Sequence, residues 1–176
     1  MKLKEIDFRE LRFNPMTMIG QDWMLLTAGN ESSGYNTMTA AWGHLGAIWD
    51  LSGRKGHLPT AVIYVRPQRY TKEFVDREAF FTLTFFEEGW KKQLAYLGSV
   101  SGREEDKISK VGLTPVFGCG TTWFAEASLV LVCRKLYQQE LNEEGFVDRE
   151  LVDRNYPQRD FHTMYIGEIV KVLVKE

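Results

Sequence analysis

The chain has 176 residues, a length that suits a single domain over 1–176, and 44% of them are hydrophobic, enough for a substantial core. Lys and Arg total 22 against 24 Asp and Glu, and the resulting net charge of −2 argues against a general nucleic-acid binder. The charged N-terminal stretch has no apolar segment typical of a signal peptide, and no apolar run reaches the roughly 20 residues of a transmembrane helix. We therefore expect a cytoplasmic protein that binds neither nucleic acid nor membrane.

The first part of the chain is predicted to consist of strands. The apolar segment 22–28 is followed by a turn rich in Gly and Ser and by a second strand over 35–49, which together predict a hairpin. This second strand is unusual, because small and hydroxyl-bearing residues separate its aromatic residues. After a polar loop over 50–57, the β-branched segment 60–65 predicts an interior strand.

The middle of the chain predicts two short helices around one strand. Thr71 is placed to cap a helix over 72–77. The segment 79–86 then predicts a strand, because its apolar and β-branched residues are continuous. Apolar residues spaced four and three apart predict a helix over 90–97, with Gly98 as the residue that ends it.

The last part predicts one more helix and two long strands. Ser101 and Glu104 have the spacing of a capping box, and the helix that they begin is expected to end before Gly112. Long strands are predicted over 125–141 and 161–174. Six or so strands with a few short helices, and no regular alternation of strand and helix, favour a mainly β fold, an antiparallel barrel with helices attached.

Several motifs that carry catalytic chemistry are absent from the sequence, among them the dinucleotide fingerprint, the P-loop, H-E-x-x-H and G-x-S-x-G. The three histidines, His44, His57 and His162, do not pair at ligand spacing, so we predict no metal site. Cys119 and Cys133 fit no metal spacing and are interpreted as structural. An enzyme built from this chain would therefore take its chemistry from a bound organic cofactor.

Three segments have residue types that suit a planar ring with an anionic tail. Small and hydroxyl-bearing residues at 36–42 let backbone and hydroxyl groups approach a flat ring. Arg66 and Arg69 flank a turn that leads into a helix N-terminus, a favourable place for a phosphate. The segment 97–107 places glycines and serines before a helix, where free amides bind anions. Each segment also has a purely structural interpretation, as a bent barrel strand, a solvated turn and a capped helix, but together they indicate FMN rather than a dinucleotide.

These residues resemble the flavin reductase-like, FMN-binding split-barrel family, in particular its flavoredoxin-like branch. The resemblance rests on NTMTAAWGHLG at 36–46, VRPQRYT at 65–71, FTLTFF at 81–86 and LGSVSGREEDK at 97–107. It continues through EASLVLVCRKLY at 126–137 and HTMYIGEI at 162–169, so the blocks keep the family's order over nearly the whole chain. The loop over 50–57 departs from the family pattern, in which the tryptophan leads directly into the next strand.

The resemblance implies a six-stranded antiparallel split β-barrel that forms a homodimer with FMN near the subunit interface. The implied flavin-binding residues are Asn36, Thr37, Met38, Thr39, Ala40 and Trp42 beside the flavin, Arg66, Arg69, Tyr70 and Thr71 near the ribityl phosphate, and Ser99, Val100, Ser101, Gly102 and Lys107 on another side. His162 would lie at the outer wall, as a contact to the nicotinamide, a proton donor, or an interface or surface histidine. Because Asp160 is two residues away, we expect it to share the face of His162 and raise its pKa.

The activity that the resemblance implies is that of a flavin-dependent oxidoreductase, in which NADH or NADPH reduces FMN and electrons pass on to a second acceptor. Hydrogen bonds from Thr37 and Thr39 would tune the flavin, and Lys107 or Arg69 would favour its anionic reduced form. Two alternatives stay open: an FMN electron carrier that is reduced by a protein partner, and a non-catalytic flavin-binding or storage protein.

Overall fold

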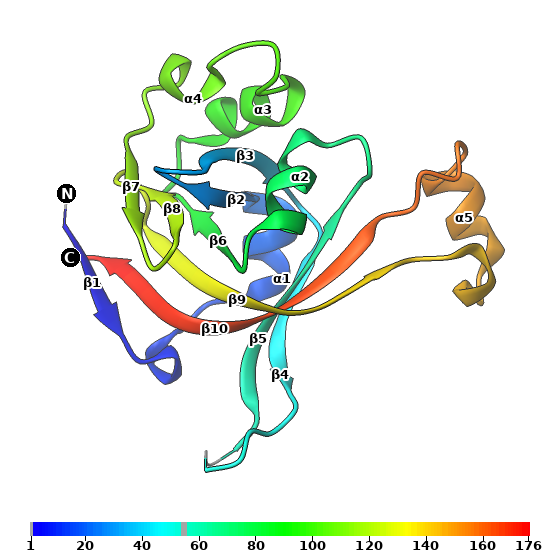
Figure 1. The fold of residues 1–176 in the computed structure, drawn as a ribbon, viewed down its shortest axis with the longest axis horizontal. Coiled ribbons are helices and arrows are strands. Elements are labelled where there is room, and N and C mark those ends of the chain that lie inside the picture. The colour runs from blue at the N-terminus through cyan, green and yellow to red at the C-terminus, as the bar shows by residue number, and fades with distance from the viewer. Residues whose placement is uncertain (1, 54–55) are drawn as a thin grey trace.

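The computed structural model describes residues 2–53 and 56–176, so Arg54 and Lys55 of the predicted 50–57 loop lie outside the described residues. Its main feature is an eight-stranded antiparallel sheet (Figure 1). The hydrogen-bonded order is β3 (Gly34–Ala40), β2 (Met24–Asn30), β6 (Phe80–Phe85), β9 (Leu129–Glu140), β10 (Thr163–Lys175), β5 (Leu58–Val65) and β4 (Gly43–Ile48), and β1 (Leu3–Ile6) pairs with β10. The mainly β fold that the sequence predicts is confirmed, although the sheet has more strands than the six expected.

The sheet is split between β3 and β4, which are the two ends of the hydrogen-bonded order within the described ranges. The prediction of one strand over 35–49 was therefore wrong: the chain leaves β3 at Ala40, passes through Ala41 and Trp42, and enters β4 at Gly43. A Cβ atom on Gly43 would lie 2.8 Å from the carbonyl oxygen of Val62, so this close approach of β4 to β5 requires glycine. The small residues of this stretch thus mark the place where the barrel opens.

The core of the barrel is formed by every second side chain along its strands. Phe81, Leu83 and Phe85 of β6 all point into one buried cluster, together with Ile63 of β5 and Tyr165 of β10. Burying a side chain of this size removes it from water and stabilises the fold by roughly 1.5–3 kcal/mol. The barrel therefore holds its strands, and the residues at the split, in fixed positions.

Two of the predicted helices are confirmed to within two residues, but their ends differ from expectation. α2 (Tyr70–Arg77) begins before Thr71, which lies inside the first turn and does not cap it. α3 (Lys91–Ser99) continues through Gly98, whose Cβ position would be 3.2 Å from Cβ of Thr39. Gly98 is needed for the contact between α3 and β3, and not to end the helix.

The capping box predicted at Ser101 is not formed. α4 (Lys107–Lys110) is only one turn long, and Asp106 caps it by accepting a hydrogen bond from the backbone N–H of Ser109 at 3.2 Å. Ser101 instead accepts from the backbone N–H of Arg103 at 3.2 Å, within a turn that precedes the helix. The aspartate next to the helix has displaced the more distant serine as the cap.

The remaining elements were not predicted from the sequence. They are the 3-10 helices η1 (Phe8–Glu10) and η3 (Glu143–Gly145), α1 (Pro15–Thr17), the π-helical turn η2 (Met18–Asp22), the hairpin of β7 (Pro115–Gly118) and β8 (Thr121–Phe124), and α5 (Arg149–Asn155). Cys119 is exposed at the β7–β8 turn, whereas Cys133 is buried in the barrel core, where a structural role is expected. No helix in the described ranges is long and apolar enough to span a membrane.

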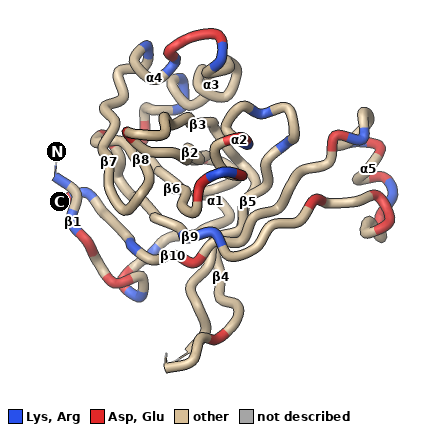
Figure 2. The backbone as a smooth tube through the Cα atoms, viewed as in Figure 1, with Lys and Arg blue, Asp and Glu red and all other residues tan. Residues whose placement is uncertain are grey.

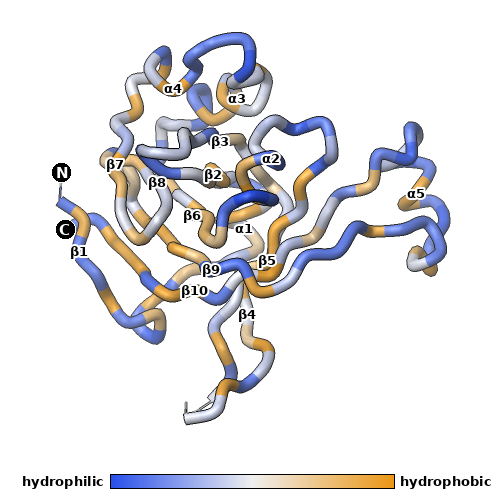
Figure 3. Tube along the Cα trace, in the orientation of Figure 1, coloured by the Kyte–Doolittle hydropathy of each residue, from blue (hydrophilic) through white to orange (hydrophobic). Residues whose placement is uncertain are grey.

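β9 and β10 continue beyond the barrel as a two-stranded arm that ends at α5, and the β4–β5 hairpin projects in a different direction (Figure 1). Hydrophilic segments surround α5, interrupted by hydrophobic residues (Figure 3). These residues form a small core of their own, in which Val152, Tyr156 and Phe161 are buried and Leu141 and Phe146 pack against them. The arm thus has enough apolar contact to hold α5 in place away from the barrel.

Candidate functional site

A cavity of about 190 Å³ lies where the barrel splits, between the end of β3 and the end of β5. It is lined by Met38, Thr39, Ala40, Ala41, Trp42, Tyr64, Arg66, Arg69 and His162. All of these residues except Ala41 and Tyr64 were predicted as site residues from the sequence. The fold therefore brings together the small residues of β3, the arginine turn and the candidate catalytic histidine.

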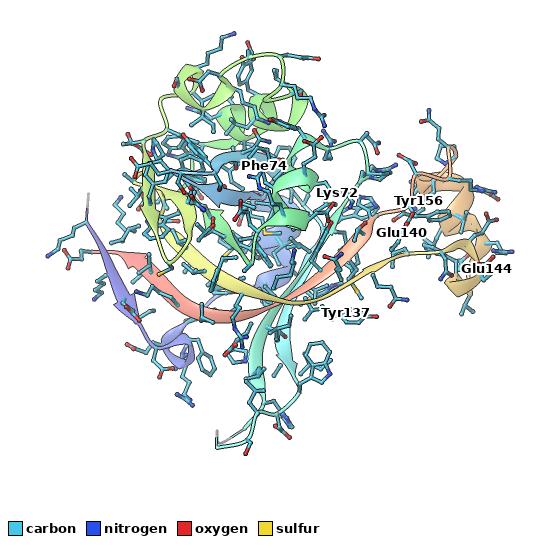
Figure 4. All side chains as sticks on the ribbon, in the orientation of Figure 1. Lys72, Phe74, Tyr137, Glu140, Glu144 and Tyr156 are labelled. Atoms are coloured by element: carbon cyan, nitrogen blue, oxygen red, sulfur yellow. The ribbon has the colours of Figure 1, made fainter. Side chains whose placement is uncertain are left out.

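A larger cavity of about 870 Å³ adjoins the smaller one, and the two share Ala41, Trp42 and Tyr64 in their linings. Its other walls come from η2, from β4, and from the arm that carries α5. Figure 4 shows Tyr156, one of these wall residues, at the α5 end of the arm. Trp42 stands at the junction of the two cavities.

The two arginines of the smaller cavity differ in how they are bound. Arg66 forms an ion pair with Asp160 and donates to the carbonyl of Asn155 at 2.7 Å. The hydrogen bond from Gln68, followed by the contact with Arg66, lowers the pKa of the Asp160 carboxyl. Arg69 is partnered among the described residues only by the carbonyl of Gly98, at 3.1 Å. The charge of Arg66 is therefore compensated by a carboxylate, and that of Arg69 is not.

The two threonine hydroxyls predicted to face the flavin are both engaged within the protein. Thr37 is fully buried, lies 2.8 Å from the hydroxyl of Thr27 and donates to the carbonyl of Leu26 at 3.2 Å. Thr39 donates its hydroxyl hydrogen to the carbonyl of Leu94 in α3. Of the two, only Thr39 lines the cavity, so Thr37 contributes to the packing of β3 on β2.

Asn36, which does not line the cavity, joins the three predicted segments behind it. Its side-chain amide donates to the hydroxyl of Thr71 at 2.8 Å, which ties β3 to the first turn of α2. A Cβ atom on Gly102 would collide with Oδ1 of Asn36, so the 99–102 loop can lie here only with glycine at this position. Tyr70 lies against the same loop and packs under the guanidinium of Arg103, 4.4 Å from its ring centroid.

Lys107 also acts on the 97–107 segment from behind the cavity. Its ammonium group donates to the carbonyls of Leu97 at 2.8 Å and Val100 at 2.9 Å, at the end of α3. Burial, and then the neighbouring charge of Arg69, lower the pKa of Lys107 to about 8. Lys107 therefore stabilises the C-terminal end of α3 by binding its last carbonyl groups. Ser99, the last residue of α3, and Val100 and Ser101, in the loop that Lys107 holds, lie outside the lining of the smaller cavity.

His162 is buried, with only 8% of its surface exposed, and faces the smaller cavity. Its Nδ1 is 2.8 Å from the hydroxyl of Tyr156, and its ring packs against Trp42 with 4.8 Å between centroids. Burial, and then the charge of Arg66, lower the pKa of His162 to about 4. Asp160 does raise this pKa, as expected, but its effect is smaller than that of burial and of Arg66, so the net shift is downward. His162 is therefore a neutral imidazole at pH 7.

Sequence reasoning missed Tyr64 and Tyr156. Tyr64 lies two residues before Arg66, so strand alternation could have placed both on the same side of β5. Tyr156 lies one helical turn after Val152, and Asp148 is a possible N-cap before both. This pattern is only a weak signal for a short helix. Nothing in the sequence indicates that this helix returns to the site.

Comparisons with known proteins agree with this geometry at the level of the fold. No family model and no curated protein matches the sequence. Among solved structures, flavoredoxin of Desulfovibrio vulgaris (Miyazaki F) matches with a TM-score of 0.63 and 24% identity, over 88% of this chain and 69% of that chain. An FMN-binding domain of a flavin reductases-like enzyme from Shewanella baltica OS155 matches with a TM-score of 0.64 and 14% identity, over 98% and 77%.

A third structure, a protein with a split barrel domain from Shewanella frigidimarina NCIMB 400, matches with a TM-score of 0.64 and 15% identity, over 97% of this chain and 76% of that chain. The break between β3 and β4 is consistent with a barrel of this kind. The chain thus has the fold of the flavoredoxin and flavin reductase-like FMN-binding split-barrel proteins, as its sequence resemblance implied.

Proposed function

We propose that the protein binds FMN without a covalent bond and acts as an oxidoreductase of the flavin reductase type, which passes electrons from NADH or NADPH to a second acceptor. The observation that carries the proposal is the cavity at the split of the barrel, lined by residues that the sequence resemblance assigns to FMN. The fold supports it, because similar structures are described as flavoredoxin and as FMN-binding.

The side chains around the smaller cavity fit a flat ring with a phosphate tail. Ala40 and Ala41 leave the end of β3 open to a ring. The hydroxyl of Thr39 has given its hydrogen to Leu94, so its oxygen offers lone pairs to a ring N–H. Because about 190 Å³ is less than the roughly 300–1,000 Å³ of most ligand pockets, the ring would also use the adjoining cavity at Trp42.

Arg69 is the residue that we assign to the phosphate or to charge on the flavin. A guanidinium group binds phosphate through two parallel hydrogen bonds, and that of Arg69 has no carboxylate partner within the described residues. Lys107 was the alternative, but its ammonium group is bound to two carbonyls at the end of α3. Its part in binding is therefore to hold the loop of Ser99 to Gly102 in place.

FMN supplies the redox chemistry when it is bound, and the protein supplies orientation, exclusion of water and hydrogen bonds. Trp42 and His162 form a wall of the cavity. With Nδ1 directed at Tyr156, His162 has Nε2 left for a ligand. As a neutral imidazole it would accept or donate a hydrogen bond, and it would not act as an imidazolium acid at pH 7.

The proposal includes a homodimer with FMN near the interface. Ile48 and Trp49 are exposed at the end of β4, on the projecting β4–β5 hairpin, and line neither cavity. Large exposed apolar residues on a projecting hairpin are typical of a surface that a partner covers. Light scattering on the purified protein would give the mass of a dimer, and a monomeric mass with FMN bound would contradict this part.

An electron carrier reduced by a protein partner is the second candidate. One observation favours it: the larger cavity has no Lys or Arg in its lining within the described residues, so the pyrophosphate of a nicotinamide dinucleotide would find no cation there. A reduced partner protein needs no such cation.

The absorption spectrum of the purified protein and a titration with free FMN test the binding of FMN. We expect flavin bands, or quenching of FMN fluorescence that saturates at one FMN per chain; a colourless protein that quenches nothing would sink the proposal. Anaerobic stopped-flow reduction then separates the activities. Rapid bleaching by NADH or NADPH supports the reductase, bleaching only by a reduced protein supports the carrier, and bleaching by neither indicates a storage protein.

A further inference from the structure

We propose that the larger cavity is a binding site for a neutral, planar aromatic or quinoid molecule. Its volume of about 870 Å³ lies within the roughly 300–1,000 Å³ of organic-ligand pockets. As the site of the second substrate, it rests on the proposed function, because it adjoins the predicted FMN cavity through Ala41, Trp42 and Tyr64. Binding of the ring is nevertheless measurable without any electron transfer.

Aromatic side chains from two parts of the fold line this cavity. Trp42 and Tyr64 come from the split of the barrel, and Phe146 and Tyr156 come from the arm. The ring of Trp42 packs against that of His162, and 44% of the surface of Trp42 is exposed. Aromatic rings attract a planar ligand by offset stacking and by edge-to-face contact, so these walls favour a flat ring over a flexible chain.

The rest of the lining is mostly apolar, and its polar members are His44, Gln139, Glu140, Asn142 and Asn155. Its large aliphatic members are Met16, Ile19, Leu45, Leu141 and Leu151. Glu140 is the only charged residue among the described lining residues, and it lies on the arm near the end of β9 (Figure 4). The smaller cavity, in contrast, has Arg66 and Arg69 in its lining.

This difference in charge decides which ligands the larger cavity accepts. An anion that entered it would lose hydration without gaining a cation, and Glu140 would repel it. A neutral ring loses little hydration and gains the aromatic contacts. The selection is therefore against anionic ring compounds and in favour of neutral ones of the same shape.

A polar group at the junction of the cavities suits a carbonyl-bearing ring. Tyr64 lines both cavities, and its hydroxyl lies 3.5 Å from Nδ1 of His44, which is at the limit of a hydrogen bond. Burial raises the pKa of Tyr64, so its hydroxyl stays protonated and able to donate at neutral pH. A quinone carbonyl is an acceptor for this donor.

Calorimetric titration of the full chain, with saturating FMN present, tests the inference with a matched pair of probes. The neutral probe is 2-methyl-1,4-naphthoquinone, and the anionic probe is 1,4-naphthoquinone-2-sulfonate. We expect saturable binding of the neutral probe and about tenfold weaker binding of the anionic one. Equal affinities for the two probes, or no binding of the neutral probe, would overturn the inference.

Two variants locate the binding. Glu140→Lys should strengthen binding of the anionic probe about tenfold and leave the neutral probe within about twofold. Glu144→Lys makes the same charge change on the same arm, outside the lining, and should leave the affinities of both probes within about twofold. Trp42→Leu should weaken the neutral probe about tenfold or more, because it removes a ring from the wall. If the neutral probe binds Trp42→Leu as tightly as it binds the wild type, it binds outside the larger cavity, and the inference fails.

The FMN titration of the same preparations separates this inference from the proposed function. Protein that binds FMN but not the neutral quinone retains the proposed function and overturns the inference. Protein that binds the quinone at Trp42 but not FMN retains the binding site and overturns the proposed function.

Discussion

The two cavities that meet at Trp42 are built from the same break in the barrel but have opposite electrostatic character. The smaller one is lined by Arg66 and Arg69, whereas the larger one has Glu140 and no lining cation among the described residues. Figure 2 shows the charged residues of the arm gathered around α5, beyond the strands that run back to the split. Ala41 and Trp42, the two residues between β3 and β4, thus lie between a cavity lined by two cations and one lined mostly by apolar residues.

The two arginines of the smaller cavity show the same contrast on a shorter scale. Arg66 and Arg69 flank one turn, yet Arg66 is bound to Asp160 and Asn155 in the arm. Among the described residues, Arg69 is hydrogen-bonded only to the carbonyl of Gly98. Arg66 therefore attaches the arm to the barrel, whereas Arg69 has no carboxylate partner among the described residues, which is why we propose it as the phosphate contact.

The largest effect is expected when the smaller cavity is filled and the larger one is left open. Thr39→Leu adds apolar volume to the lining, so FMN binding should weaken by more than about 100-fold while the neutral quinone still binds. Thr39→Val keeps the size of the side chain but loses its hydrogen bond to Leu94 and the oxygen proposed to accept from the ring N–H, so it should weaken FMN binding about tenfold at most. Fluorescence titration gives both affinities, and thermal unfolding checks the fold. Wild-type affinity of Thr39→Leu for FMN would show that this cavity is not the flavin site.

The next effect tests the positive side of the comparison. Arg69→Ala should weaken FMN binding by about 10- to 100-fold, because a charged hydrogen bond contributes about 1.5–3 kcal/mol. Binding of riboflavin, which lacks the phosphate, should change little. Arg103→Ala is the control, since that guanidinium is exposed and paired with Glu73. Equal losses for FMN and riboflavin would assign Arg69 to the ring and not to the phosphate.

Many strands of the barrel were predictable, because runs of apolar and β-branched residues mark each of them and successive side chains point to opposite faces of a strand. The break at Ala41 was not, because both halves of 35–49 fit a strand, and only pairing with β2 and β5 separates them. The helix α5 was missed because it is short and packs on a core in the arm. Local patterns therefore indicate the elements, whereas the edges of a sheet depend on contacts between distant segments.

The site was predictable where residue type and spacing carry the chemistry, as for Arg66 and Arg69. It was not predictable where a side chain finds its partner across the fold. Asp160 was expected to raise the pKa of His162, two residues away, but it is paired with Arg66, which is 94 residues away, and its effect on His162 is outweighed by burial and by Arg66. Nδ1 of His162 is hydrogen-bonded to the hydroxyl of Tyr156.

The titration of His162 tests the wall between the cavities. Its pKa is about 4 in the folded chain and 6.5 when unperturbed, so between these values the unfolded chain binds a proton that the folded chain does not. This contribution to stability is fully present above pH 6.5 and is lost as the pH falls towards 4. Urea unfolding of the wild type should show a loss on the order of 2–3 kcal/mol over this range.

The variant His162→Asn should remove most of this dependence on pH, whereas His57→Gln, on an exposed side chain, should keep it. A wild type whose stability is flat between pH 6.5 and 4, or a dependence that survives His162→Asn, would show that His162 is not held neutral by burial. The Asp160 carboxylate titrates at lower pH, because its pKa is also lowered.

The smallest effect comes from a hydroxyl that connects the wall of the larger cavity to the histidine of the smaller one. Tyr156 lines the larger cavity with its ring, and its hydroxyl binds the histidine of the smaller one at 2.8 Å. Tyr156→Phe keeps the ring in the arm core and leaves Nδ1 of His162 without its partner, so it should lower the free energy of unfolding by about 1 kcal/mol. Tyr137→Phe removes a hydroxyl from the same arm, where it binds Gln139 at the surface, and should have less effect.

The affinities of the Tyr156→Phe variant then decide how separate the cavities are. If FMN and quinone affinities both stay within about threefold of the wild type, a change of less than about 0.7 kcal/mol, the cavities act as neighbours that share only a wall. A loss of FMN affinity near tenfold would mean that the arm sets the position of His162 in the smaller cavity. In that case a ligand that moves Tyr156 from the larger side would also alter FMN binding, because coupling between two sites is reciprocal.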